Sequence, residues 1–146
     1  MLTLETNNDA APQAFILDSL RRENRRKCQW LREHSAPADG ADEDSAHNII
    51  AYDSGRVVGG AIGHAEYNWH TLDLLFVDDG HRRQGVGRAL MAQMERHARD
   101  RGLTGIRLET WDFQARGFYE RLGFTVYGQL ADCPPGTITY FMKKEF

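Results

Sequence analysis

The stretch from Trp69 to Thr110 constrains the fold more than any other part of the chain. It opens with a short apolar run, Trp69 to Val77, whose length and composition predict a central strand buried on both faces. An amphipathic helix follows from Val86, and Gly102 is placed to cap its C-terminus. Ile106 to Thr110 then alternates apolar and polar residues, as a strand does. Strand, loop, helix and strand form a crossover unit, so we expect two parallel strands and an α/β fold.

Further strands are predicted on both sides of this unit. Ile49 to Tyr52 and Val57 to Ile62 flank a linker of hairpin length. Phe124 to Leu130 and Thr137 to Met142 form another pair, and Leu2 to Thr6 alternates apolar and polar side chains. The sheet should therefore contain six or seven strands.

About four helices are expected around this sheet. From Pro12 to Arg32 the chain has apolar residues at helical spacing and lacks Gly, which predicts one or two helices. Gln114 to Leu122 predicts a short helix that Gly123 stops. Ser35 to Ser45 has the composition of a solvated loop. Because the chain shows no repeat or domain linker, residues 1–146 are predicted to form a single domain.

Composition restricts the class of protein. With 146 residues, of which 41% are hydrophobic, the chain can bury a core without metals or disulfides. The net charge of -3 argues against a nucleic-acid binder, so the basic run Arg21 to Lys27 is interpreted as a solvated helix face. Cys28 and Cys133 lack a Cys-x-x-Cys partner, and the six histidines lack metal-binding spacing. With no membrane span or leader recognisable, we expect a cytoplasmic protein without a metal.

The loop Arg82-Arg83-Gln84-Gly85-Val86-Gly87 lies between a predicted strand and a predicted helix. The N–H groups and the dipole of a helix N-terminus favour an anion, and glycines let a phosphate approach the backbone. Arg82, Arg83 and Arg88 add local positive charge. The alternative is a tight turn with solvated arginines. Leu90 occupies the place of the third glycine of a dinucleotide fingerprint, and the Gly-Lys-Ser/Thr of a P-loop is absent.

Two segments around this loop identify a family. Leu75-Phe76-Val77, four residues, and then the Arg82 to Gly87 loop resemble the acyl-CoA signature of GNAT acetyltransferases. Downstream, Ala115 to Phe124 resembles the Ala-x-x-Phe-Tyr-x-x-x-Gly-Phe element of that superfamily. The match covers Val57 to Phe146. The pairs and triplets Trp69-His70, Phe113-Gln114-Ala115 and Pro135-Gly136 are similar to those of small stand-alone bacterial acetyltransferases.

The resemblance implies a mixed, splayed sheet and acetyl-CoA as the cofactor. The backbones of Leu75 and Val77 would bind the pantetheine arm, the amides from Arg83 to Arg88 would hold the pyrophosphate, and the Val77 N–H would stabilise the oxyanion. The predicted cofactor contacts are Leu75, Phe76, Val77, Arg82, Arg83, Gln84, Gly85, Val86, Gly87, Arg88, Gln114, Phe118 and Tyr119.

Tyr119 matches the family tyrosine that protonates the departing thiolate. Without the family it would be interpreted as a core aromatic beside Phe118. In the usual pattern an Asn stands seven residues before this tyrosine and contacts the cofactor. Here the position holds Asp112, which puts that contact in doubt.

A general base is needed because only a neutral amine attacks a thioester. Strand alternation would place Trp69, Thr71, Asp73, Leu75 and Val77 on one face, and the family often places its base at a position equivalent to Asp73 or Thr71. Asp73 is the first candidate. Burial would raise its pKa unless a neighbouring arginine lowers it again. Glu66, His64 and a water chain are the alternatives.

The predicted function is transfer of an acetyl group from acetyl-CoA to a primary amine of a small molecule or protein. The alternatives are a non-catalytic acyl-CoA sensor, or a homodimeric accessory protein with Trp69, Trp111 and Tyr67 at its contact surface. Four carboxylates between Ser35 and Ser45 suggest a cationic acceptor or simply a solvated loop.

Overall fold

A computed structural model describes residues 1–34 and 46–146. The described residues belong to two compact units, residues 1–34 and residues 46–146, which are considered separately. The predicted solvated loop Ser35 to Ser45, with its carboxylates, lies outside the described residues. The single domain therefore stays a prediction.

The first unit contains two helices, α1 (Ala10–Lys27) and α2 (Gln29–His34), as predicted. Residues 1–9 form neither helix nor strand, so the prediction of a strand from Leu2 to Thr6 is wrong. A strand needs a neighbour to pair its N–H and C=O groups, and no other strand occurs in residues 1–34.

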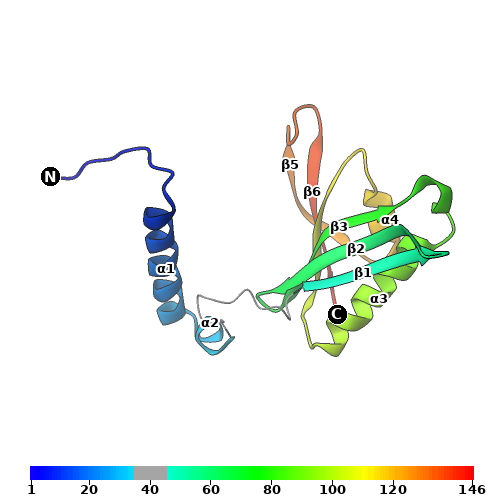
Figure 1. Cartoon of the computed structure of the whole chain (residues 1–146), viewed down its shortest axis with the longest axis horizontal. Helices are drawn as coiled ribbons and strands as arrows, with labels where there is room; N and C mark the ends of the chain where they lie inside the picture. Colours follow the sequence, from blue (N-terminus) through cyan, green and yellow to red (C-terminus); the bar gives the residue numbers. More distant parts are fainter. Residues whose placement is uncertain (35–45) are drawn as a thin grey trace. The chain divides into compact units, whose positions relative to one another are not determined.

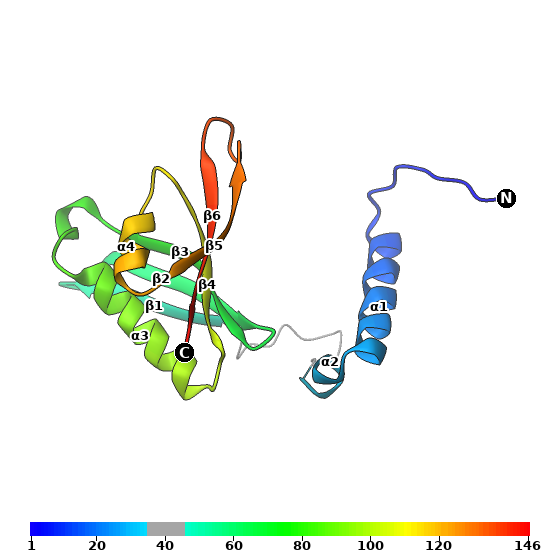
Figure 2. The same cartoon turned by 180° about the vertical axis from the view of Figure 1, so that it is seen from behind.

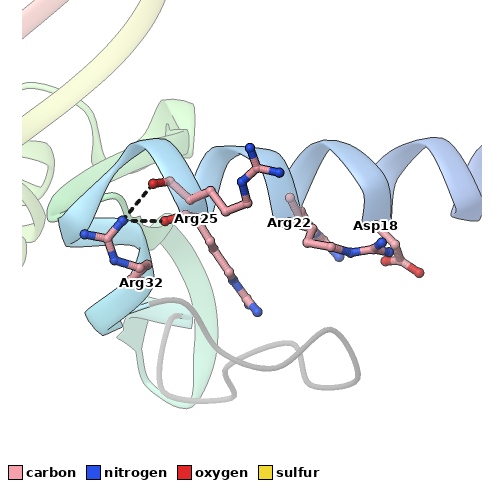
Figure 3. Close-up of a pocket in the computed structure, with 6 residues that line it drawn as sticks. Asp18, Arg22, Arg25 and Arg32 are labelled. Atoms are coloured by element: carbon pink, nitrogen blue, oxygen red, sulfur yellow. Dashed lines mark hydrogen bonds between the residues drawn. The ribbon is translucent and has the colours of Figure 1, made fainter.

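The basic run of α1 is partly neutralised within this unit. The Arg32 side chain donates from Nη1 to the carbonyl oxygens of Arg25 (3.0 Å) and Arg26 (2.8 Å), as Figure 3 shows. This places a cation at the C-terminus of α1, where the helix dipole favours it. Glu23 forms ion pairs with Arg26 and Lys27. No residue of α1 is buried, in agreement with a solvated face.

The second unit is built on one mixed sheet (Figure 1). Its six strands are β1 (Ala46–Asp53), β2 (Arg56–Glu66), β3 (Trp69–Val77), β4 (Gly105–Trp111), β5 (Thr125–Ala131) and β6 (Ile138–Glu145). The order is β1-β2-β3-β4-β6-β5, in which β3 and β4 are parallel and all other neighbours antiparallel. The α/β fold and the crossover are confirmed.

Two helices cover one face of this sheet, α3 (Val86–Asp100) and α4 (Arg116–Arg121), with a short 3-10 helix, η1 (Asp79–His81), before them (Figure 2). Leu90, Met91, Met94 and Ala98 of α3 are buried against the strands, as an amphipathic helix requires. Gly102, with φ +69°, ends α3 in the predicted left-handed cap. No helix in the two described ranges is both long and apolar enough to cross a membrane.

A β-bulge in β3 overturns two predictions about that strand. Leu72 pairs with Gly63 and Leu74 with Ile62, so Asp73 is the extra residue that interrupts the alternation of faces. Leu72 is buried, but Leu74 and Phe76 are 64% and 60% exposed, so the strand is not buried on both faces. Leu75 and Val77 pack against the core, whereas Asp73 is exposed. The residues Trp69, Thr71, Asp73, Leu75 and Val77 therefore do not share one face.

Three histidines from different elements meet inside the second unit. His47 of β1 stacks on His97 of α3, with ring centroids 3.2 Å apart, and meets His70 of β3 edge-on at 6.2 Å. Within the described residues, both ring nitrogens of His70 and the Nε2 atoms of His47 and His97 are buried without hydrogen-bond partners. Burial lowers the pKa of all three, that of His70 to about 4, because a buried imidazolium would lack solvation.

We expect this cluster to make the fold sensitive to acid. The unfolded chain binds a proton at His70 below its ordinary pKa of 6.5, whereas the folded protein binds it only near 4. The free energy of unfolding should therefore fall between these pH values, by at most about 3 kcal/mol for this residue. His70→Leu should flatten the pH dependence of the unfolding temperature between pH 7.5 and 5. The exposed His34→Gln variant should keep the native dependence, and an unchanged slope in His70→Leu would refute the assignment.

Candidate functional site

The sheet opens between β3 and β4. Their parallel register runs from His70/Ile106 to Leu72/Leu108, although β3 continues to Val77 and β4 to Trp111. Beyond Leu72, β3 stays paired with β2 and β4 stays paired with β6. The predicted splayed sheet is confirmed, with a gap between the C-terminal halves of two parallel strands.

Two N–H groups of β3 face this gap. The Asp78 N–H donates to a β2 carbonyl at 2.8 Å. Because N–H groups of a strand alternate sides, Phe76 shares the β2 side, and Leu75 and Val77 face the gap. The contact of the Val77 carbonyl supports this assignment, because the carbonyl accepts a hydrogen bond from Arg82 Nε at 3.0 Å instead of from β2. A ligand lying in the gap therefore meets strand-like donors.

The start of α3 supplies a second group of donors directly after β3. Gly85 is the N-cap residue of α3, with φ +81°, and Arg83 also has a positive φ of 61°. The first helical hydrogen bond is accepted by the Gly85 carbonyl. The N–H groups of Val86, Gly87 and Arg88 therefore have no partner within the helix and suit an anion.

Side chains of the loop divide into two roles. Arg82 Nη1 lies 2.6 Å from Asp79, and Gln84 Nε2 donates to the Gly80 carbonyl at 3.1 Å, so both side chains brace the loop. Arg83 and Arg88 form no ion pair within residues 46–146. Their charges are available to a phosphate group.

His81 ties this loop to the β1–β2 turn. Its Nε2 lies 3.0 Å from Asp53 and its Nδ1 lies 3.3 Å from Asp78. These hydrogen bonds raise the pKa of His81 and lower the pKa values of Asp53 and Asp78. The two carboxylates and the imidazolium of His81 are therefore all charged at pH values between the lowered carboxyl pKa values and the raised pKa of His81. The attraction between them is lost as pH rises through the pKa of His81.

Tyr119 lies on α4 beside the same loop. The residue is 6% exposed, and its ring meets those of Phe118 and Phe124 edge-on, at 5.2 and 5.8 Å. A side chain at Gly87 would touch Phe118 at 3.4 Å, which shows how closely α4 approaches the start of α3. Burial raises the pKa of Tyr119 to about 12, so at neutral pH the hydroxyl keeps its proton.

The candidate bases, which belong to β2 and β3, lie close together. His64 Nδ1 lies 2.8 Å from the Asp73 carboxylate, and His64 Nε2 lies 3.9 Å from Glu66. Arg107 of β4 contacts Glu66 at 3.0 Å and donates from Nε to Thr71 at 2.9 Å. Arg107 is therefore held by Glu66, and Asp73 contacts a histidine instead of the neighbouring arginine considered as an alternative. Asp73 is 43% exposed, not desolvated as predicted.

Comparison with known families decides the identity. A family model described as the acetyltransferase (GNAT) family matches residues 13–124. The chain belongs to the GNAT family of acetyltransferases. The family recognised from the Leu75 to Gly87 and Ala115 to Phe124 segments is confirmed.

Known GNAT proteins resemble the chain in sequence and in fold. Blasticidin-S acetyltransferase of Streptomyces morookaense is 44% identical over 92 residues, 62% of this chain and 68% of that protein. An acetyltransferase structure from Bacillus cereus has a TM-score of 0.79 at 23% identity, covering 99% of this chain and 98% of the other. A streptothricin acetyltransferase from Bacillus anthracis, solved with acetyl-CoA, has a TM-score of 0.66 at 23% identity, covering 73% and 65%.

Some residues predicted to contact the cofactor instead form hydrogen bonds or strand pairing within this GNAT structure. The Gln114 side-chain oxygen accepts from the Trp111 N–H at 3.0 Å and from the Thr110 hydroxyl at 3.2 Å, which closes the turn after β4. Phe76 directs its backbone to β2 and exposes its ring. Asp112 is exposed and donates its N–H to the Ile138 carbonyl at 3.0 Å. A cofactor role for Gln114 and Phe76 stays a prediction.

Sequence reasoning missed the partners that hold the site together. His81 with Asp53, and Arg107 with Glu66, join residues 28 and 41 positions apart in the chain. Thr71 and Arg107 lie opposite each other in the parallel register of β3 and β4. This register could have pointed to Arg107, but it is known only once the two strands are paired.

Proposed function

We propose that this GNAT protein transfers an acetyl group from acetyl-CoA to a primary amine by direct attack in a ternary complex. The observation that carries the proposal is the presence of two groups of backbone donors, one at the end of β3 and one at the start of α3. Leu75 and Val77 present N–H groups to the gap, and Val86, Gly87 and Arg88 present theirs at the helix start. An extended amide arm that ends in a pyrophosphate matches this series, and coenzyme A has that construction.

The Val77 N–H is our proposed oxyanion donor. Its gap-facing N–H is fixed by the β2 pairing on one side of the strand and by the Arg82 contact to its own carbonyl. A donor fixed in this way stabilises the charge that develops on a thioester oxygen, typically by about 2.7 to 4 kcal/mol.

Asp73 and His64 form our proposed base. Asp73 is the bulge residue at the point where β3 and β4 part, and His64 Nδ1 lies 2.8 Å from its carboxylate oxygen. The substrate ammonium gives one proton to this pair, the neutral amine nitrogen then forms a bond to the carbonyl carbon, and the carbon–sulfur bond breaks.

Tyr119 is our proposed acid. The thiolate that leaves on breakage of the carbon–sulfur bond takes the hydroxyl proton of Tyr119, and the second proton that the nitrogen loses on becoming an amide passes through solvent to restore this hydroxyl. At neutral pH the hydroxyl is protonated and has a proton to give, although burial, which raises its pKa to about 12, makes it a weaker acid than an exposed tyrosine. We place the reaction in the cytoplasm, where acetyl-CoA is formed.

A small-molecule amine is our proposed acceptor. Blasticidin-S acetyltransferase, which is 44% identical over the matched residues, is named for a small molecule. The alternative of an acyl-CoA sensor uses the same donors but needs neither Asp73 nor Tyr119. A homodimer stays a prediction.

The experiment that tests the proposal is release of coenzyme A thiol from acetyl-CoA, measured with and without a panel of primary amines. Amine-dependent release matched by one acetylated product per thiol supports acetyl transfer to the amine. Tight acetyl-CoA binding without thiol release in the presence of any amine, small or protein-borne, would favour the sensor.

A further inference from the structure

A hollow of about 360 Å³ lies at the point where β3 and β4 part. It is lined by Thr71, Leu72, Asp73, Arg107, Leu108, Glu109 and Tyr127. These residues come from β3, β4 and β5, so the hollow faces the gap from both parting strands. Leu75 and Val77, the gap-facing donors, follow directly along β3.

The hollow has a carboxylate on each of the two parting strands. Leu72 and Leu108 are the last paired residues, and Asp73 and Glu109 come next on their strands. Glu109 is exposed and forms no ion pair within residues 46–146. Asp73 has His64 as its partner.

The one arginine of the hollow does not balance these charges. Arg107 contacts Glu66 at 3.0 Å, and its Nε is used by Thr71 at 2.9 Å. Its charge is therefore matched by a carboxylate that does not line the hollow. A cation entering the hollow meets the uncompensated Glu109 and the Asp73–His64 pair.

An aromatic ring completes the lining. Tyr127 of β5 is 55% exposed, and its ring lies 6.2 Å from that of Phe141. A cation beside such a ring gains a further attraction from the ring face. The hollow thus offers two separate recognition points, Asp73 for one cation and Glu109 with Tyr127 for another.

We propose that the acceptor is a dication: a primary amine joined by a short spacer to a second basic group, whose charge Glu109 and Tyr127 bind while Asp73 receives the reacting amine. This inference rests on the proposed transferase function. Glu109 is a specificity residue in it, not a member of the proton-transfer pair.

The test compares three probes of similar size: n-butylamine with one charge, and 1,4-diaminobutane and agmatine with two. The native protein should show kcat/KM at least 10-fold higher for the two dications than for n-butylamine. Glu109→Gln should raise KM for the dications about 10-fold, leave their kcat within about 3-fold, and leave n-butylamine unaffected. Glu145→Gln, on the exposed end of β6, is the matched control and should leave all values unchanged.

Calorimetric titration of the coenzyme A-loaded protein with agmatine provides a second measurement that does not require turnover. Binding that Glu109→Gln weakens about 10-fold supports the inference. A preference for n-butylamine, or equal agmatine binding by the native protein and Glu109→Gln, would overturn the dication while leaving the transferase intact. Failure of the protein to bind coenzyme A would instead overturn the proposed function.

Discussion

Asp73→Asn is expected to lower kcat for amine acetylation by about 10²- to 10⁴-fold, the usual contribution of a general base. The amide has nearly the same size and can still contact His64, but it cannot take the proton that the substrate ammonium must lose before it attacks. Asp73 is 43% exposed at the bulge of β3, so the change leaves no buried cavity and should not lower the unfolding temperature.

The split between kcat and KM separates a base from a structural residue. Asp73→Asn should lower kcat while KM for acetyl-CoA stays within about 3-fold of the native value, because the backbone donors proposed to bind the cofactor are unchanged. His64→Gln should give a smaller loss of kcat. Asp100→Asn, at the C-terminus of α3, is the control for a surface carboxylate. Native kcat in Asp73→Asn would remove Asp73 from the role of base and leave Glu66, His64 or a water chain.

Tyr119→Phe is expected to lower kcat by about 10²- to 10⁴-fold while acetyl-CoA affinity stays within about 3-fold of the native value. The phenyl ring keeps the contacts with Phe118 and Phe124, so the α4 packing is preserved. Only the hydroxyl that would protonate the leaving thiolate is lost. Steady-state rates and acetyl-CoA titration on the same preparation measure the two quantities.

The matched control is Tyr52→Phe, which removes a hydroxyl from an exposed residue of β1. It should keep native kcat and affinity. A parallel loss of kcat and affinity in Tyr119→Phe, or no loss of either, would remove Tyr119 from the acid role and leave it as a core aromatic.

Local sequence patterns predicted most elements of the second unit because each element follows from neighbours in the chain. The apolar residues of α3 recur on one helical face and Gly102 caps it, so both its existence and its end could be predicted. The crossover rule then predicted that β3 and β4 are parallel. The Leu2 to Thr6 segment shows the limit of such patterns, because alternation without a partner strand does not produce a strand.

The candidate site was less predictable because its geometry depends on pairing. One extra residue at Asp73 changes which side chains face the core, and a bulge depends on the opposite strand as much as on its own sequence. The contacts of His64 with Asp73 and of Arg107 with Glu66 likewise depend on register. The loop from Arg82 to Gly87 was predictable since a short motif placed between strand and helix defines it.

The measurement that tests the central claim most directly is calorimetric titration with acetyl-CoA of the native protein and two glycine variants. Gly85 and Gly102 both have positive φ, and a side chain on either would meet no atom within 4 Å, so Asp imposes similar backbone strain at opposite ends of α3. Gly85→Asp also places a negative charge at the proposed pyrophosphate site. We predict micromolar binding by the native protein and Gly102→Asp, and at least a 100-fold weaker affinity for Gly85→Asp. No binding by the folded native protein, or equal binding by all three, would contradict the account.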